Sequence, residues 1–214
     1  MTMPEPTTSL PSAADFARAA DRAALDRVVK TLAERGINAR ILSDRADARA
    51  AVDQLIPDGA LVYNTTSRTL DELGISDDVR SATRYRATRS HTETLNRATQ
   101  MDEFRRHVAT MDVVIGSVHA VTEDGHVVIA SASGSQLASY AFGASQVIWV
   151  VGSQKIVNDL DEAFARIEQH SLPLESQRLQ QVYGQPSIIG KQLVISHEQP
   201  GRITMLLLQD TIGF

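Results

Sequence analysis

The residues Gln146-Val-Ile-Trp-Val-Val151 form the longest apolar run in the chain and have the length of a single strand. Two earlier runs, Asp112-Val-Val-Ile-Gly116 and His126-Val-Val-Ile-Ala130, are also rich in β-branched residues. Continuous apolar runs, without polar residues at alternate positions, are typical of strands that helices cover on both faces. No run reaches the ~18 apolar residues that a membrane-spanning helix needs.

Shorter strands and several helices are expected around these runs. Capping residues and apolar stripes at helical spacing predict helices at 12–35, after Asp44, from the 64–67 loop to Gly74, over 93–110 and after Asn158. A further short strand is expected at 40–42. The alternation predicts an α/β fold with an open, mostly parallel sheet flanked by helices, built from strands at 60–63, 112–116, 126–130, 146–151 and 203–208. We expect a disordered N-terminal tail over residues 1–11 and a single domain over 12–214.

Cysteine is absent from all 214 residues, which excludes several kinds of chemistry. The chain can form no disulfide, use no thiolate nucleophile and hold no cysteine-ligated zinc or iron–sulfur cluster. The formal charge of −5, with acidic residues around the basic pairs, argues against a nucleic-acid partner. Because residues 1–12 lack the basic and apolar regions of a secretory signal, we expect a cytoplasmic protein without a membrane anchor. We expect no cofactor and no structural metal, since the six histidines are scattered.

Ligands bind to open α/β sheets beyond the carboxyl ends of the strands, and four loops are expected there. They span 64–68, 116–125, 131–136 and 152–155. Their hydroxyl groups, glycine amides and basic side chains could bind an anion. The candidate ligand-binding residues are Thr66, Ser67, Arg68, His119, Ser133, Gly134, Ser135 and Lys155. Ordinary explanations stand beside this one: helix capping by Ser67, a flexible turn around Gly134, and an exposed position for Lys155.

Glu123 lies between two predicted buried strands, where a carboxylate could act as a base, a nucleophile or a ligand anchor. A tight turn explains Asp124 and Gly125. If the segment is helical, His119 and Glu123 share one face and form half of a metal site, although a hydrogen-bonded pair is the commoner arrangement. No third ligand is visible in the sequence. The chain also has no nucleophile elbow, no P-loop and no glycine-rich dinucleotide motif.

An ordered set of segments resembles the lactate-utilisation (LUD) family, which includes the LutC-like proteins. The segments are Ala120-Val-Thr-Glu-Asp-Gly125, Ala141-Phe-Gly143 with Val147-Ile-Trp-Val-Val-Gly152, Lys155-Ile-Val-Asn-Asp-Leu160, and Pro200-Gly-Arg-Ile-Thr204 with Ile212-Gly-Phe214. Upstream, Leu55-Ile-Pro-Asp-Gly59 and Thr69-Leu-Asp-Glu-Leu-Gly74 are similar to the first half of the family. The resemblance covers residues 25–214.

The resemblance implies a fold related to the NagB/RpiA/CoA-transferase group. It also implies a role in the oxidation of L-lactate to pyruvate together with iron–sulfur partner proteins. The segment Thr122-Glu-Asp-Gly125 is similar to one that carries the nucleophilic glutamate of the related CoA transferases, a role that Glu123 would inherit. The chain departs from the common LUD pattern at His119, where many members have asparagine. It departs again at Ala132-Ser-Gly-Ser-Gln136, which replaces a segment containing an arginine.

Three hypotheses of function follow. The first is a LutC-like accessory or regulatory protein of organic-acid utilisation that binds a small anionic metabolite at the strand ends. The second is an enzyme of the isomerase or CoA-transferase type that uses Glu123 as nucleophile or base. The third is a ligand-free assembly subunit, and a homodimer is a further candidate assembly.

Overall fold

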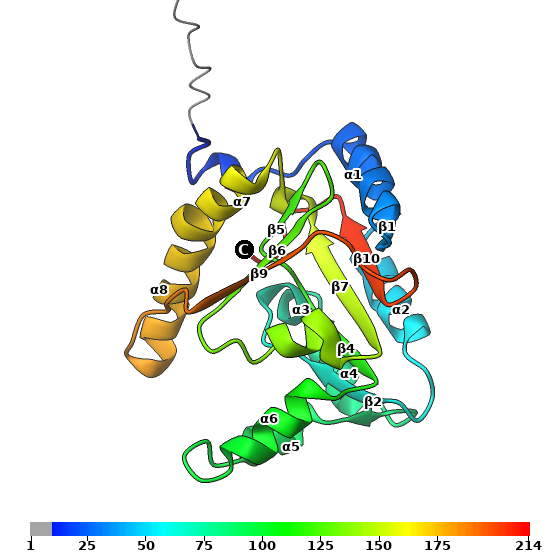
Figure 1. Ribbon diagram of the computed structural model, residues 1–214, viewed down its shortest axis with the longest axis vertical. Helices are drawn as coiled ribbons and strands as arrows, with labels where there is room; N and C mark the ends of the chain where they lie inside the picture. The colour runs from blue at the N-terminus through cyan, green and yellow to red at the C-terminus, as the bar shows by residue number, and fades with distance from the viewer. Residues whose placement is uncertain (1–9) are drawn as a thin grey trace, which may run out of the picture.

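The computed structural model describes residues 10–214 and has a sheet of six parallel strands at its centre (Figure 1). From one edge to the other, the strands are β1 (Asn38–Leu42), β10 (Ile203–Leu208), β7 (Gln146–Gly152), β4 (Val113–Gly116), β2 (Leu61–Asn64) and β3 (Arg86–Ala87). All five neighbouring pairs are parallel. The predicted open, parallel α/β architecture is therefore confirmed, with strands at four of the five predicted positions in this sheet.

Helices and helical turns connect the strands. The α-helices are α1 (Arg22–Glu34), α2 (Arg45–Leu55), α3 (Arg68–Glu72), α4 (Ile75–Ser81), α5 (Arg89–Thr94), α6 (Met101–Ala109), α7 (Leu160–Arg166) and α8 (Leu172–Tyr183). The shorter turns are the 3₁₀ segments η1 (Asp15–Ala17) and η3 (Ser153–Lys155) and the π-helical turns η2 (Ser139–Gly143) and η4 (Ile167–Ser171).

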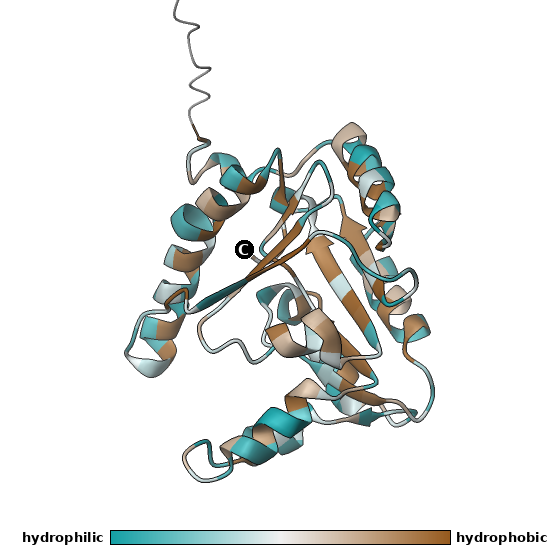
Figure 2. Ribbon diagram, in the orientation of Figure 1, coloured by the Kyte–Doolittle hydropathy of each residue, from teal (hydrophilic) through white to brown (hydrophobic). Residues whose placement is uncertain are grey.

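Side chains of β7 pack alternately on the two faces of the central sheet. Val147, Trp149 and Val151 belong to a cluster that also contains apolar side chains of α1 and α6. Ile148 and Val150 belong to a second cluster, with side chains of α2, α3 and α4. All five are completely buried, and the central strands are the most hydrophobic part of the ribbon in Figure 2. Helices on both faces explain why this run has no polar alternation.

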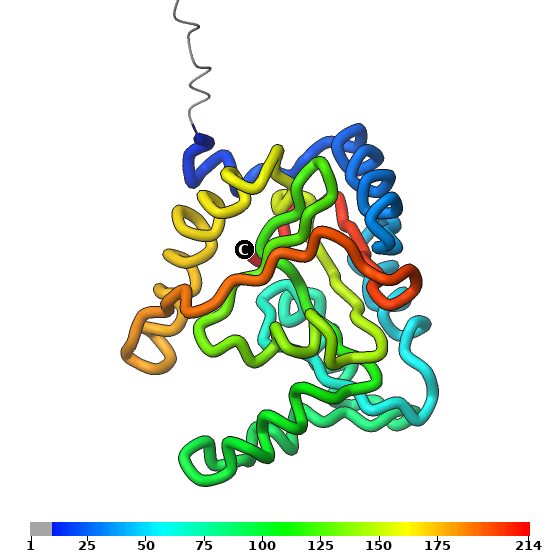
Figure 3. Tube along the Cα trace, in the orientation of Figure 1, coloured from blue at the N-terminus to red at the C-terminus, as the bar shows by residue number. Residues whose placement is uncertain are grey.

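A second sheet of four strands contributes to the first cluster. Its order is β8 (Ile156–Val157), β5 (Ala120–Thr122), β6 (Val127–Ser131) and β9 (Lys191–Ile195). Side chains of β5, β6 and β9 pack with those of β7, whereas the opposite face of this sheet packs with α7. Figure 3 shows the chain leave α8, cross the molecule through β9 and then return to β10.

The prediction that 126–130 belongs to the central sheet is wrong. This segment forms β6, which pairs antiparallel with β5 and β9 in the second sheet. A parallel neighbour of β4 would need a crossover of about a dozen residues or more, and β6 begins only eleven residues after the end of β4. Gly125, at a φ of 90°, instead turns the chain into a hairpin.

The predicted helix at 12–35 is also wrong in its first part. Residues near Ser12 form only the short turn η1, and the chain is extended at Arg18. Asp21, not Ser12, caps α1, because its carboxylate accepts a hydrogen bond from the Ala24 amide at 2.8 Å. Phe16 packs instead into the apolar cluster beneath α7.

Two further helices differ from prediction. The single helix expected over 93–110 is two helices, α5 and α6. Between them, the Asn96 side chain accepts a hydrogen bond from the Ala98 amide at 2.9 Å, a local turn that competes with helix. Asp159 caps α7, whereas Asn158 donates a side-chain hydrogen bond to Glu162.

Within the described part of the chain, no helix combines the length and the apolar character needed to cross a membrane. The predicted disordered tail at 1–11 falls mainly on residues 1–9, which lie outside the described residues.

Candidate functional site

A cavity of about 360 Å³ lies at the carboxyl ends of the central strands. The loops after the central strands β2, β4 and β7 contribute to its wall, as the carboxyl-end rule predicts for parallel strands. The loop after β6, a strand of the second sheet, contributes to the wall as well. Apolar side chains of η4, α8 and the segment before β9 form another part of the wall, among them Ile167, Leu179 and Ile188. This volume lies at the lower end of the range for small-molecule sites, roughly 300–1,000 Å³.

Seven of the nine candidate residues line this cavity: Thr66, Ser67, Arg68, His119, Ser133, Ser135 and Lys155. Gly134 does not line it. Its φ of 84° and the 2.9 Å hydrogen bond from its amide to the Ser131 hydroxyl assign it to the turn after β6. Glu123 also lies outside the cavity wall. The ligand-binding role of the lining residues stays a prediction.

Lys155 is the basic side chain buried most deeply in the wall. It ends η3, directly after β7, and its residue is only 2% exposed. Its Nζ donates to the hydroxyl of Thr69 at 3.0 Å and to that of Ser117 at 3.1 Å. The alternative of an exposed lysine is therefore wrong. The two hydroxyls come from α3 and from the loop after β4, so Lys155 links three of the segments that meet at this sheet edge.

The surroundings of Lys155 disfavour its charge. Burial, and secondarily the positive charge of Arg166, lower the pKa of Lys155 from 10.5 to about 7, while Glu72 opposes the shift. Among residues 10–214, no carboxylate forms an ion pair with this ammonium group. An unpaired buried charge is costly, so the site favours either a neutral amine or an added anion.

Arg166, the last residue of α7, is a second buried cation near this site and is 0% exposed. Its guanidinium donates to the backbone oxygens of His119 and Gln154, at 2.6 and 3.2 Å, and to the Ser171 hydroxyl at 3.0 Å. Its Nη2 has no hydrogen-bond partner among the described residues. Burial lowers its pKa from 12.5 to about 10, so Arg166 remains charged at neutral pH. Its hydrogen-bond acceptors among residues 10–214 are all neutral, and no carboxylate there forms an ion pair with it.

His119 is held neutral between these cations. Burial, with the charges of Lys155 and Arg166, lowers the pKa of His119 from 6.5 to about 3. Its Nδ1 accepts a hydrogen bond from the Ala130 amide at 3.2 Å, so the proton resides on Nε2. In the wall of the cavity, His119 is therefore a hydrogen-bond donor rather than a cation.

The buried floor of the cavity is built around Gly116, the last residue of β4. The hydroxyl of Tyr140 lies 3.1 Å from the hydroxyl of Thr65, and burial raises the pKa of the Tyr140 phenol. A Cβ atom on Gly116 would collide with both hydroxyls. Only glycine lets these two polar groups meet at this position, and Tyr140 in turn packs edge-on against Trp149 at a centroid distance of 5.4 Å.

A π-helical turn joins α7 to α8 along the apolar wall. Pro173 lies in the first turn of α8. Because proline has no backbone N–H, it cannot donate the helical hydrogen bond to the carbonyl group four residues earlier. The wider turn η4 precedes it and contributes Ile167 and Ser171 to the cavity. Such π-turns often mark functional sites. Arg178 of α8 forms a bidentate pair with Glu175, at 2.7 and 2.8 Å, so this arginine is already balanced.

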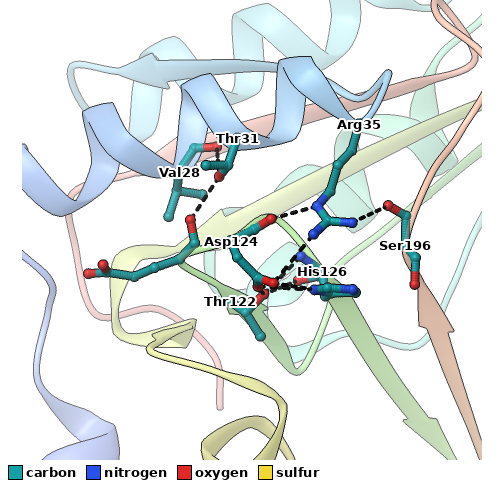
Figure 4. Close-up of polar contacts among 8 residues, drawn as sticks. Val28, Thr31, Arg35, Thr122, Asp124, His126 and Ser196 are labelled. Atoms are coloured by element: carbon teal, nitrogen blue, oxygen red, sulfur yellow. Dashed lines mark hydrogen bonds and ion pairs between the residues drawn. The ribbon is translucent and has the colours of Figure 1, made fainter.

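The β5–β6 hairpin carries Glu123. At this residue the hairpin contacts α1 and not the cavity wall. The Thr31 hydroxyl donates to the backbone oxygen of Glu123 at 2.9 Å, and Arg27 forms a bidentate pair with its carboxylate at 2.7 and 3.3 Å. Arg35 reaches the backbone and side chain of Asp124, which also pairs with His126 at 3.0 Å (Figure 4).

This chain is similar to known proteins in both sequence and fold. The family model described as the LUD domain matches residues 25–208, which is most of the chain. The chain belongs to the LUD domain family. A crystal structure of a DUF162 family protein from Deinococcus radiodurans is similar in fold, with a TM-score of 0.55 and 13% sequence identity over 88% of this chain and 99% of that one. A search among curated proteins finds no match. Family membership supports a role associated with lactate utilisation.

In this LUD domain, the alternative of a helical segment with His119 and Glu123 on one face is wrong, because β5 lies between them. The two residues also differ in environment, since His119 lines the cavity and Glu123 is ion-paired at the surface. Over residues 10–214, no group of three or more histidine, aspartate and glutamate side chains is placed to hold a metal ion.

We expect Glu123→Gln to have little effect on stability or ligand binding. The Arg27–Glu123 pair is solvent-exposed, and the hairpin keeps the backbone bond from Thr31. Exposed ion pairs contribute little, so the melting temperature should stay within about 2 °C of the wild type. Thermal melts with and without ligand measure both effects. Loss of a ligand-induced shift in Glu123→Gln alone would contradict this expectation.

Several residues of the site were absent from the sequence-based set. Thr65, Thr69 and Ser117 line the cavity beside predicted residues, and Arg166 lies behind it. The position of Arg166 could have been found from the sequence. It follows Ala163 by three residues, on the helix face that carries apolar side chains. An arginine on a buried helical face indicates a specific polar role.

Proposed function

We propose that this LUD domain is an accessory or regulatory protein of lactate utilisation that binds a small organic anion in the cavity. The observation that carries the proposal is the pair of buried cations, Lys155 and Arg166, neither of which has a carboxylate partner among the described residues. Burying positive charge without a partner costs free energy, and an anionic ligand would offset that cost.

The other groups in the cavity wall fit a small carboxylate-bearing metabolite. His119, Ser133 and Ser135 provide short hydrogen-bond donors, while Ile167 and Leu179 offer an apolar surface to a carbon skeleton. The volume of about 360 Å³ suits a compact molecule better than a whole nucleotide cofactor. The proposal gives Glu123 no chemical role, because its carboxylate lies outside the wall and is paired with Arg27.

Ligand-dependent thermal stability tests this function. The wild-type protein is melted with L-lactate, pyruvate, an acyl-CoA and a sugar phosphate in turn. A ligand at a hundred times its Kd should stabilise the protein by about 2.7 kcal/mol, which corresponds to a shift of roughly 5–10 °C for a chain of this size. We expect a small carboxylate to give the largest shift.

Two lysine variants decide whether the cavity is responsible. Lys155→Met should abolish the ligand-induced shift, because it removes the charge at the cavity. Lys30→Met, an exposed position on α1, should keep it. Absence of a shift with every anion would contradict the proposal and favour the ligand-free assembly subunit, to which the exposed Val182, Tyr183 and Ile188 would contribute contacts.

A further inference from the structure

We propose that Lys155 is a nucleophile that captures the carbonyl carbon of a small 2-oxo acid as an imine. The inference rests on the proposed function, since it uses the same cavity, and it narrows the ligand from any organic anion to one with a ketone beside its carboxylate. It also assigns Lys155 a covalent role in place of simple charge recognition.

The surroundings of the amine support this role. Lys155 Nζ is hydrogen-bonded to two neutral hydroxyl groups, those of Thr69 and Ser117, in the wall of a cavity. A carboxylate at this distance would keep the group protonated as an ammonium ion, whereas a hydroxyl oxygen can accept a hydrogen bond from the neutral amine as well. Lysines become nucleophilic when they are desolvated in a pocket or placed beside another cation, and Lys155 meets both conditions.

The ionisable groups around Lys155 come from α3, α7, η4 and the residue before β5. Arg166 of α7 disfavours the ammonium form, Glu72 of α3 opposes that effect, and His119 beside β5 is neutral. Burial lowers the pKa of His170 of η4, and the charges of Arg166 and Lys155 lower it further. With a pKa of about 7, about half of the Lys155 side chains carry a free electron pair at neutral pH. An ordinary exposed lysine is almost entirely protonated there.

The same groups can receive the rest of a 2-oxo acid. Its carboxylate would lie in the field of Arg166, whose Nη2 has no partner among the described residues, and would help to balance a cationic iminium at Lys155. The Ser117 hydroxyl and the Nε2 proton of His119 are donors available in the cavity wall for the ligand oxygens. The carboxylate of a 2-hydroxy acid could lie in the same field, but such an acid has no carbonyl carbon for attack.

The covalent step balances without a further reagent. The Nζ electron pair forms a bond to the ketone carbon, and the carbonyl oxygen takes up a proton to give a carbinolamine. The C–O bond then breaks, and the oxygen leaves as water with both protons that Nζ has lost. The product is a neutral imine, which becomes the cationic iminium when its nitrogen takes up a proton from water. Neither partner is oxidised or reduced, and addition of water reverses the step.

Borohydride trapping tests the proposal directly, because a hydride reduces the imine to a stable secondary amine. The full-length protein is incubated with pyruvate and sodium borohydride, and the modified lysine is identified by peptide mass mapping. The chain has only three lysines, Lys30, Lys155 and Lys191, and the two others are exposed, so each molecule carries its own controls. We expect Lys155 to be modified at least about tenfold more than either exposed lysine at pH 7.

A pH series and a charge-preserving variant sharpen the experiment. Trapping at Lys155 should increase as the pH rises through about 7, where the free amine forms. Lys155→Arg, which keeps a cation but has no primary amine, should lose the adduct. If that variant does not fold, the comparison of the three lysines within the wild-type chain still decides the question.

The outcomes separate this inference from the proposed function. Stabilisation by both pyruvate and lactate, with no adduct at Lys155, would overturn the imine and leave anion binding intact. An adduct spread evenly over the three lysines would also overturn it. If neither acid stabilises the protein and no adduct forms, the imine is overturned, and the proposed function fails as well when no other anion shifts the melting temperature. A selective adduct at Lys155 with pyruvate, and none with lactate, establishes the covalent site.

Discussion

Replacing Lys155 by methionine is expected to raise the melting temperature of the ligand-free protein by roughly 5–10 °C at pH 6. Lowering the pKa of Lys155 from 10.5 to about 7 corresponds to a destabilisation of about 5 kcal/mol when the amine is protonated in both states. Methionine removes this charge and fills similar space. The variant also loses the hydrogen bonds to Thr69 and Ser117, worth about 1 kcal/mol each at most, so the net gain is about 3 kcal/mol.

The gain should depend on pH in a defined direction. Above pH 7 the folded protein holds Lys155 as a neutral amine, while the unfolded chain still binds the proton up to about pH 10.5. Because the unfolded state then binds more protons, the free energy of unfolding of the wild type rises with pH over this window. The methionine variant has no such titration. The gain should therefore be largest below pH 7 and should be lost as the pH approaches 10.5, where the missing hydrogen bonds to Thr69 and Ser117 leave the variant less stable by up to about 2 kcal/mol.

Paired thermal melts of both proteins between pH 6 and 10.5 measure this effect. The other charged and ionisable groups near Lys155, which are Glu72, Arg166, His119 and His170, are present in both proteins, so their contributions largely cancel in the difference. Lys30→Met is the matched control, because Lys30 is exposed, and it should show no comparable gain. A methionine variant that is less stable than the wild type at pH 6 would show that Lys155 contributes to the structure. A gain would show that Lys155 lowers the stability of the folded protein, as a residue retained for function often does.

The central sheet could be predicted because its strands are buried on both faces. In β7, uninterrupted apolar residues have the length of one strand and no helical period, so their assignment did not depend on tertiary contacts. The run at 126–130 looks the same, yet it forms β6 in another sheet. Its burial was predicted correctly, but a run of apolar residues does not show which strand it pairs with. The short connection from β4 was the available signal against a parallel pairing.

The site was predictable to the extent that it follows from the topology. Parallel strands place their following loops at one edge, which is why Ser67, His119 and Lys155 meet despite their separation in sequence. The burial of Lys155 could not be predicted from the residues next to it in the sequence. It results from packing by α3 and α7, which lie in other parts of the chain. Glu123 follows a strand as well, but β5 belongs to the hairpin of the second sheet, so the carboxyl-end rule of the central sheet does not apply to it.

Gly116→Ala is expected to lower the melting temperature by roughly 5–10 °C. Gly116 ends β4 under the cavity, where an added Cβ would overlap the Tyr140 hydroxyl and lie 2.7 Å from the Thr65 hydroxyl. Both hydroxyls belong to buried side chains, so neither can simply swing into solvent. Inserting one carbon into a packed core typically costs about 1–3 kcal/mol through side-chain and backbone shifts, and we expect the upper part of that range.

A double-mutant cycle with Tyr140→Phe identifies the cause of this loss. Tyr140→Phe alone should cost about 1 kcal/mol, because it leaves the Thr65 hydroxyl without its buried partner at 3.1 Å. In the Gly116→Ala background the same change removes the atom that collides with the new Cβ, so it should restore part of the lost stability. The Tyr140 ring carbon would still lie 3.0 Å from that Cβ, so the recovery should be incomplete. Thermal melts of the four proteins give the interaction free energy, and we expect at least about 1 kcal/mol of favourable coupling. Additive losses would mean that the alanine is accommodated by movement of the β4 backbone, in which case the floor of the cavity is not held by the contact of Tyr140 with Gly116.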